Sequence, residues 1–121
     1  MERPCGCKHD TPDEALHHAF ESVTIRPTEP LIGTKTNGLA NAGKVIGFKT
    51  PDGKIRIRLD FDPKKGLHVN EEDFTRLPHL QKVVHIVEPV ASSTTEEGKK
   101  MLRNWQEHRM LLYWNKWTKR L

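Results

Sequence analysis

The sequence predicts an α+β domain with an N-terminal helix, an antiparallel sheet of about four strands and a long C-terminal helix. Three observations support this prediction. The chain has 121 residues, which is the length of one domain. Its middle segments alternate apolar and polar residues with the period of two that half-buried strands show. Segments near both ends begin with helix-start signals.

The first helix is predicted from Pro12 to about Ser22. Thr11 is a residue that can cap a helix, and Pro12 suits the first turn. Acidic residues follow at the positive end of the helix dipole. His18 lies away from the apolar stripe and is expected at the surface. The stripe consists of Ala15, Leu16, Ala19, Phe20 and Val23.

Four segments are predicted to be strands, and the first two form a hairpin. The turn between those two, Pro51–Lys54, combines a proline with fixed φ and a glycine that can take positive φ. Residues 24–43, in contrast, predict a long connection with little periodicity. The predicted strands are Lys44–Thr50, Ile55–Phe61, Leu67–Asn70 and Lys82–Glu88.

The last helix is predicted from about Thr95 to Thr118, and it carries the excess charge. Residues 96–121 hold seven basic and three acidic side chains, whereas the preceding part is neutral. Trp105, Trp114 and Trp117 lie among these basic residues. The segment can therefore be a solvated helix whose aromatic side chains pack on the core, or a surface that meets RNA or an acidic protein.

Composition excludes some classes of protein and leaves one metal site open. No apolar run approaches the ~18–20 residues of a membrane span, and we expect no secretory signal. Residues 1–10 predict a flexible tail. Two unpaired thiols, Cys5 and Cys7, fit a reducing compartment. Together with His9 they are candidate zinc ligands, although no second cysteine pair completes a four-ligand site.

One face of the predicted sheet gathers the residues that could carry chemistry. In the second strand the apolar side chains point one way and the polar ones the other. If Val84 and Ile86 face the core, then His85 joins this polar face. The expected members are Arg56, Arg58, Asp60, His68, Asn70 and His85.

Such a set is what RNA cleavage without a metal or other cofactor needs. A general base takes the proton of the 2′-hydroxyl, a general acid protonates the leaving 5′-oxygen, and cations stabilise the charge on the phosphorane. Histidine suits both proton transfers, and arginine suits the phosphate. Each histidine can instead be a structural hydrogen-bonding group. Arg56 and Arg58 can simply form ion pairs with Asp60.

The segment Ile55–Asn70, with RIRLDFDPKKGLHVN after its first residue, and KVVHIVEP at Lys82–Pro89 resemble the C-terminal toxin domains of bacterial polymorphic toxins. Many of those domains are ribonucleases of the barnase–EndoU–colicin–RelE type, with a curved antiparallel sheet. The resemblance implies that His68 and His85 transfer protons, that Arg56 or Arg58 contacts the phosphate, and that Asn70 orients the substrate or a histidine. The candidate substrate-binding residues are Asn70, Asp60, Lys64 and Lys65.

The resemblance implies a metal-independent endoribonuclease toxin of interbacterial competition. It would be delivered into the cytoplasm of a target cell and cut RNA, by analogy tRNA, to a 2′,3′-cyclic phosphate. A cognate immunity protein with an acidic surface would protect the producing cell. Two alternatives remain: a non-enzymatic RNA- or protein-binding module that uses the basic C-terminal helix, and a zinc-stabilised domain that uses Cys5, Cys7 and His9.

Overall fold

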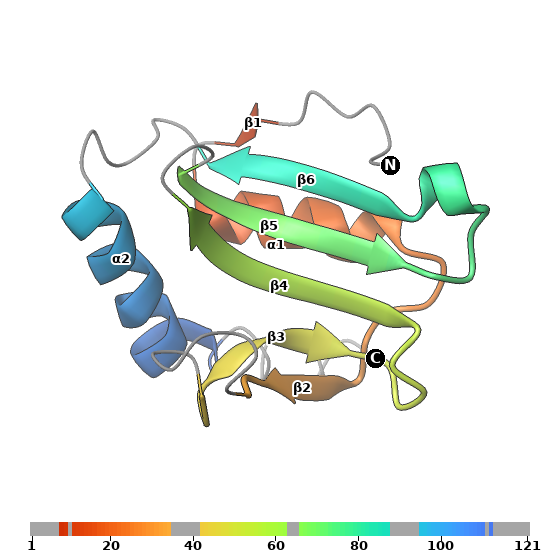
Figure 1. Ribbon diagram of the computed structural model, residues 1–121, viewed down its shortest axis with the longest axis horizontal. Coiled ribbons are helices and arrows are strands. Elements are labelled where there is room, and N and C mark those ends of the chain that lie inside the picture. Colours follow the sequence, from red (N-terminus) through yellow and green to blue (C-terminus); the bar gives the residue numbers. More distant parts are fainter. Residues whose placement is uncertain are drawn as a thin grey trace.

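A computed structural model describes residues 8–9, 11–34, 42–62, 66–87, 95–110 and 112. Its centre is a six-stranded sheet in the order β1-β6-β5-β4-β3-β2, with two helices, α1 and α2 (Figure 1). Strand β1 runs parallel to β6, and every other neighbouring pair is antiparallel. The strands are β1 (Lys8–His9), β2 (Glu29–Ile32), β3 (Val45–Lys49), β4 (Ile55–Asp62), β5 (Gly66–Asp73) and β6 (Lys82–Val87).

The predicted fold is therefore wrong in its sheet, which has six strands and is mixed instead of four-stranded and antiparallel. The two unforeseen strands are its edges. Strand β2 contains Pro30, which marks a break in the sequence, but an edge strand tolerates proline because one side of its backbone needs no partner. Strand β1 spans only Lys8 and His9, within the predicted tail, and two residues are too few to show a period.

Helix α1 (Pro12–Ser22) and the β3–β4 hairpin form as the sequence predicts. The Thr11 hydroxyl accepts a hydrogen bond from the Glu14 amide at 3.2 Å, and Pro12 stands in the first turn. In the hairpin turn Gly53 has a φ of 72°. Its amide donates to the carbonyl of Thr50 at 2.9 Å, which closes the turn.

The core lies between one face of the sheet and the helices. In Figure 1 the sheet faces the viewer and α1 lies behind it. Alternate residues of the strands point back into this layer, where they meet apolar side chains of α1 and of the C-terminal helical segment. The largest members are Leu16, Phe20, Phe48, Ile55, Ile57, Leu59, Leu67, Trp105 and Met110. Within the described residues, no helix covers the opposite face, here called the open face.

The predicted helix from Thr95 to Thr118 is wrong as one regular α-helix. Helix α2 (Thr95–Asn104) passes into a π-helical turn, Trp105–Arg109. The amide of Met110 donates to the carbonyl of Trp105, five residues back. Trp105 and Met110, five residues apart, both reach the core, and a period of 3.6 does not predict that spacing. The rest of the predicted helix, apart from Leu112, lies outside the described residues.

Candidate functional site

The two histidines proposed for catalysis lie on opposite faces of the sheet. His85 is opposite Val69, a core residue, so its ring points toward the helices. His68 is opposite Asp60 and points to the open face. Directly opposed residues of antiparallel strands share a face. The shared groove predicted for the two histidines is therefore wrong.

The reason for the error is that β6 has apolar residues at both parities. Val83 and Val87 lie on the face of His85, whereas Val84 and Ile86 lie on the other. When the residues on both faces of a strand are apolar, their alternation cannot show which face is buried. An error of one residue places every side chain of the strand on the wrong face. The choice is made by the neighbouring strand, where Glu71 presents a carboxylate to His85 on the helix side.

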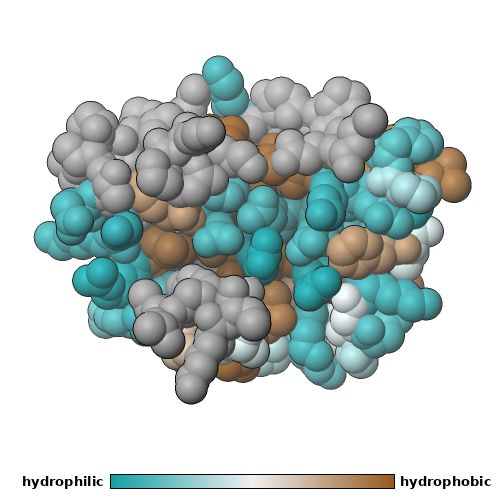
Figure 2. Space-filling view, viewed as in Figure 1, coloured by the Kyte–Doolittle hydropathy of each residue, from teal (hydrophilic) through white to brown (hydrophobic). Residues whose placement is uncertain are grey.

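The open face keeps the other predicted residues together. The register places Asp60 opposite His68, Arg58 opposite Asn70 and Arg56 opposite Glu72. These six side chains therefore form three adjacent cross-strand pairs on β4 and β5. Figure 2, viewed from this side, shows hydrophilic side chains gathered over the middle of the sheet.

His68 is held in one orientation by its own hairpin. Its Nδ1 lies 2.8 Å from the carbonyl oxygen of Gly66, so Nδ1 carries the proton and Nε2 carries the lone pair of the neutral ring. The Nε2 atom faces the Asn70 side-chain amide at 3.4 Å. Only 3% of His68 is exposed, so a ligand reaches Nε2 only when the surrounding side chains move.

The two arginines of the open face are incompletely paired. Within the described residues, their buried Nε atoms have no hydrogen-bond partner. A terminal nitrogen of Arg58 lies 4.0 Å from a Glu72 oxygen, a long ion pair, and the guanidinium of Arg56 stands 5.5 Å from the Phe74 ring centroid. Buried donors without partners are rare in proteins, and an anion such as phosphate is the natural acceptor for them.

The opposite, helix-covered face holds a second polar cluster, which contains three histidines. His85, only 2% exposed, bonds through Nε2 to a Glu71 oxygen at 2.9 Å. The Ser22 hydroxyl donates to the other Glu71 oxygen at 2.9 Å. On its other side, Nδ1 of His85 lies 3.4 Å from Nε2 of His9, and the ring of His18 packs against His9. His18 is exposed, as predicted, but it belongs to this cluster.

Glu71 was not among the predicted site residues, although the sequence contains a signal for it. The alternation that puts Leu67 and Val69 inside continues to Glu71 and Asp73, and both of these carboxylates are 0% exposed. Acidic residues at core-facing positions indicate buried partners, because an unpaired buried charge is costly. The predicted strand ends at Asn70, whereas β5 continues to Asp73, so neither carboxylate was placed on the inner face.

Several predicted residues lie outside the described part of the chain. These are Lys64, Lys65, Cys5, Cys7 and the basic, aromatic residues after position 112. Their predicted roles in phosphate, zinc or partner binding stay predictions. Of the C-terminal aromatic residues, Trp105 packs in the core with the Arg109 guanidinium 5.8 Å from its ring centroid, which agrees with the structural interpretation of that tryptophan.

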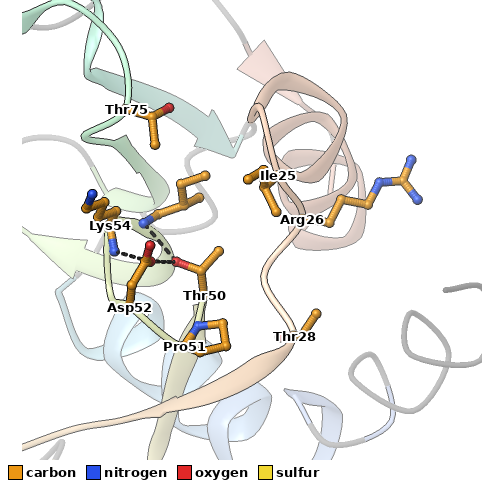
Figure 3. Close-up of a pocket in the computed structure, with 9 residues that line it drawn as sticks. Ile25, Arg26, Thr28, Thr50, Pro51, Asp52, Lys54 and Thr75 are labelled. Carbon is orange, nitrogen blue, oxygen red and sulfur yellow. Dashed lines mark hydrogen bonds between the residues drawn. The ribbon is translucent and has the colours of Figure 1, made fainter.

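A separate cavity of about 420 Å³ lies beside the β3–β4 turn, between that turn and the segment after α1 (Figure 3). Its polar groups are largely occupied with the turn. The Thr50 hydroxyl donates to Asp52 at 2.6 Å, and this hydrogen bond, with one from the Lys54 amide, lowers the pKa of Asp52. Figure 3 shows the Arg26 side chain directed away from the other lining residues. The cavity thus offers little chemistry of its own.

Comparison with known proteins gives no family for this chain. No protein-family model matches the sequence, and no curated protein matches it. Among the helices that the structure describes, none combines the length and apolar composition needed to cross a membrane.

Proposed function

We propose that the protein is an endoribonuclease toxin that binds RNA on the open face, at β4 and β5. The resemblance of Ile55–Asn70 to toxin domains supports the reaction class. The pairing of β4 with β5 supports the location, because it assembles an imidazole, an amide and two incompletely paired guanidinium groups on one surface. His85 has no part in this chemistry.

Because His85 lies on the other face, His68 is the base of the proposed site and water takes the place of the general acid. His68 takes the 2′-hydroxyl proton at Nε2, the 2′-oxygen forms a bond to phosphorus, and the bond from phosphorus to the 5′-oxygen breaks. Water protonates the leaving oxygen, and the imidazolium later returns its proton to solvent. The products are a 2′,3′-cyclic phosphate and a 5′-hydroxyl.

The neighbours of His68 have complementary roles. Asp60, directly across the strand pair, stabilises the imidazolium that forms. Arg58 and Arg56 bind the non-bridging phosphate oxygens and stabilise the phosphorane. Asn70 orients the His68 ring or the ribose. Lys64 and Lys65 add phosphate contacts in this proposal, and tRNA is its preferred substrate by analogy.

The single observation that carries the proposal is the orientation of His68. The hydrogen bond from Nδ1 to the Gly66 carbonyl leaves Nε2 as the basic atom, on the face of the two arginines. A purely structural histidine would need only the first of these features. The delivery of the toxin into a target cell and an immunity protein with an acidic surface belong to the same proposal, since the basic C-terminal segment would attract such an inhibitor.

The test is cleavage of total RNA by the wild type and by His68→Ala, with His79→Ala as control, because His79 is an exposed histidine away from both clusters. General base catalysis contributes about 10²–10⁴-fold, so His68→Ala should lose that factor while circular dichroism shows a folded protein. Cleavage should persist in EDTA at a temperature at which the metal-free protein is still folded. Wild-type rates in folded His68→Ala, or no cleavage by the wild type, refute the proposal.

A further inference from the structure

We propose that His9, His18 and His85 bind one Zn²⁺ ion on the helix-covered side of the sheet. The three residues come from β1, α1 and β6, which are distant in the sequence. One ligand nitrogen from each ring can be chosen so that all three lie within 4.8 Å of one another. The ring centroids are 4.6 Å apart for His9 and His18, 5.5 Å for His9 and His85, and 6.4 Å for His18 and His85.

The spacing of the two buried ligands fits zinc geometry. Two nitrogens bound to a tetrahedral Zn²⁺ at the usual distance of ~2.0–2.1 Å lie about 3.3–3.4 Å from each other. The Nε2 atom of His9 and the Nδ1 atom of His85 are 3.4 Å apart. The third ring, His18, is exposed, so rotation of its side chain can close the remaining distance.

A buried carboxylate holds the ring nitrogen of His85 that would not bind the ion, as is common for histidine ligands of zinc. Glu71 is 0% exposed and lies 2.9 Å from Nε2 of His85, so in the neutral ring Nε2 carries the proton and Nδ1 has the lone pair on the side of His9. Ser22 holds the other Glu71 oxygen at 2.9 Å. Metal-bound histidines commonly donate their second ring N–H to a carboxylate, which fixes the tautomer and raises the basicity of the ligand.

The kind of ligand atom indicates which metal ion would bind. Three imidazole nitrogens and no carboxylate ligand favour Zn²⁺ over Mg²⁺ or Ca²⁺, which prefer oxygen. Three protein ligands leave one coordination position for water, and the exposed His18 marks the side from which solvent reaches the ion.

The expected consequence is attachment of the N-terminal strand. Strand β1 has only two residues, and its backbone pairs with β6 at the edge of the sheet. An ion held by His9, His18 and His85 would join β1 to both α1 and β6. Zn²⁺ at about 100 times its Kd should therefore raise the Tm by roughly 10 °C, since it binds only the folded chain.

The experiment is a titration of the full, tag-free chain with ZnSO₄ after treatment with EDTA, followed by calorimetry and thermal melting. We expect one ion per chain. His18→Ala should abolish both the binding and the Tm increase, and its exposed position preserves the fold. The matched control is His17→Ala, the adjacent exposed histidine of α1, which should bind as the wild type does.

A second variant tests the partner of His85. Glu71→Gln should weaken Zn²⁺ binding about 10–100-fold without changing its stoichiometry. The proposal is overturned if the wild type binds no Zn²⁺, or if His17→Ala and His18→Ala bind equally well. It is also overturned if the double variant Cys5→Ser, Cys7→Ser abolishes binding while His18→Ala retains it, because the site would then be the cysteine site.

Discussion

Replacement of Asp73 by alanine should be among the most destabilising changes on the polar side chains of this protein. The carboxylate ends β5, is 0% exposed and accepts hydrogen bonds from the segment after α1 and from its own turn. Thr24 donates its amide and hydroxyl, each at 3.0 Å. Thr75 donates its amide at 3.1 Å and also its hydroxyl, and Arg76 donates Nε at 3.2 Å.

The size of the effect follows from the donors left behind. In Asp73→Ala, five donors lose a charged acceptor, and hydrogen bonds to charged groups contribute about 1.5–3 kcal/mol each. Thr24 and Thr75 are exposed, so water replaces part of each bond. The hydroxyls and Arg76 can turn toward solvent and add less, so we expect a loss of about 3–5 kcal/mol. Proteins of this size have a stability of only ~5–15 kcal/mol. Urea denaturation, followed by the fluorescence of the buried Trp105, measures the loss as a lower midpoint.

The same carboxylate makes this loss depend on pH. Burial alone would raise the pKa of Asp73, but the hydrogen bonds from Thr75 and Thr24 outweigh it and lower the pKa below its ordinary value of 3.8. The stabilisation is complete above 3.8 and is lost as the pH falls through the folded-state pKa. The difference between wild type and Asp73→Ala should therefore shrink in acid.

Asp52→Ala is the control, because the pKa of Asp52 is also lowered but its side chain is exposed, so its midpoint should shift far less. A loss below about 1 kcal/mol for Asp73→Ala, or a difference that does not change with pH, would refute the reasoning.

Three further predictions concern packing and charge. Gly47→Ala should lower the Tm more than Gly98→Ala in thermal melts. A Cβ at Gly47 meets the backbone of β4, whereas one at Gly98 meets the Phe61 ring, which can rotate. Equal decreases in Tm would contradict this. Phe48→Ala, fully buried against Phe20, should cost about 3–5 kcal/mol in urea denaturation, and a cost near zero would mean that Phe48 is not in the core. The double variant Arg56→Gln, Arg58→Gln should reduce the slope of log K against log salt for single-stranded RNA by about 1.4, and an unchanged slope would place the RNA elsewhere.

The parts that the sequence predicts well are those with several independent local signals. Helix α1 has a capping residue and a proline that mark its start, and an apolar stripe that marks its buried face. The β3–β4 hairpin similarly combines a turn with positive φ at Gly53 and clean alternation in β4. Agreement among local signals predicted these elements without knowledge of the neighbours.

The parts that failed depend on tertiary neighbours. In β6, valines at both parities leave the face of His85 undecided, and only the pairing with β5 settles it. Strands β1 and β2 are edges that exist because β6 and β3 offer them backbone partners. The π turn after Asn104 likewise depends on packing, because Trp105 and Met110 both contribute to the core. The open-face group was predictable because β4 alternates cleanly, whereas the histidine cluster required the three-dimensional arrangement.

The sheet separates the two proposed sites, and this separation gives each proposal a test that the other cannot imitate. Arg58 and His68 lie on the open face, while His18 and His85 lie on the helix side. Because the two groups lie on opposite faces of the sheet, the effects of Arg58→Gln and His18→Ala on stability should add within about 0.5 kcal/mol. If His18→Ala removed RNA cleavage while leaving the fold intact, the histidine cluster would be the catalytic site, and the open face would be reduced to a solvated surface of ion pairs.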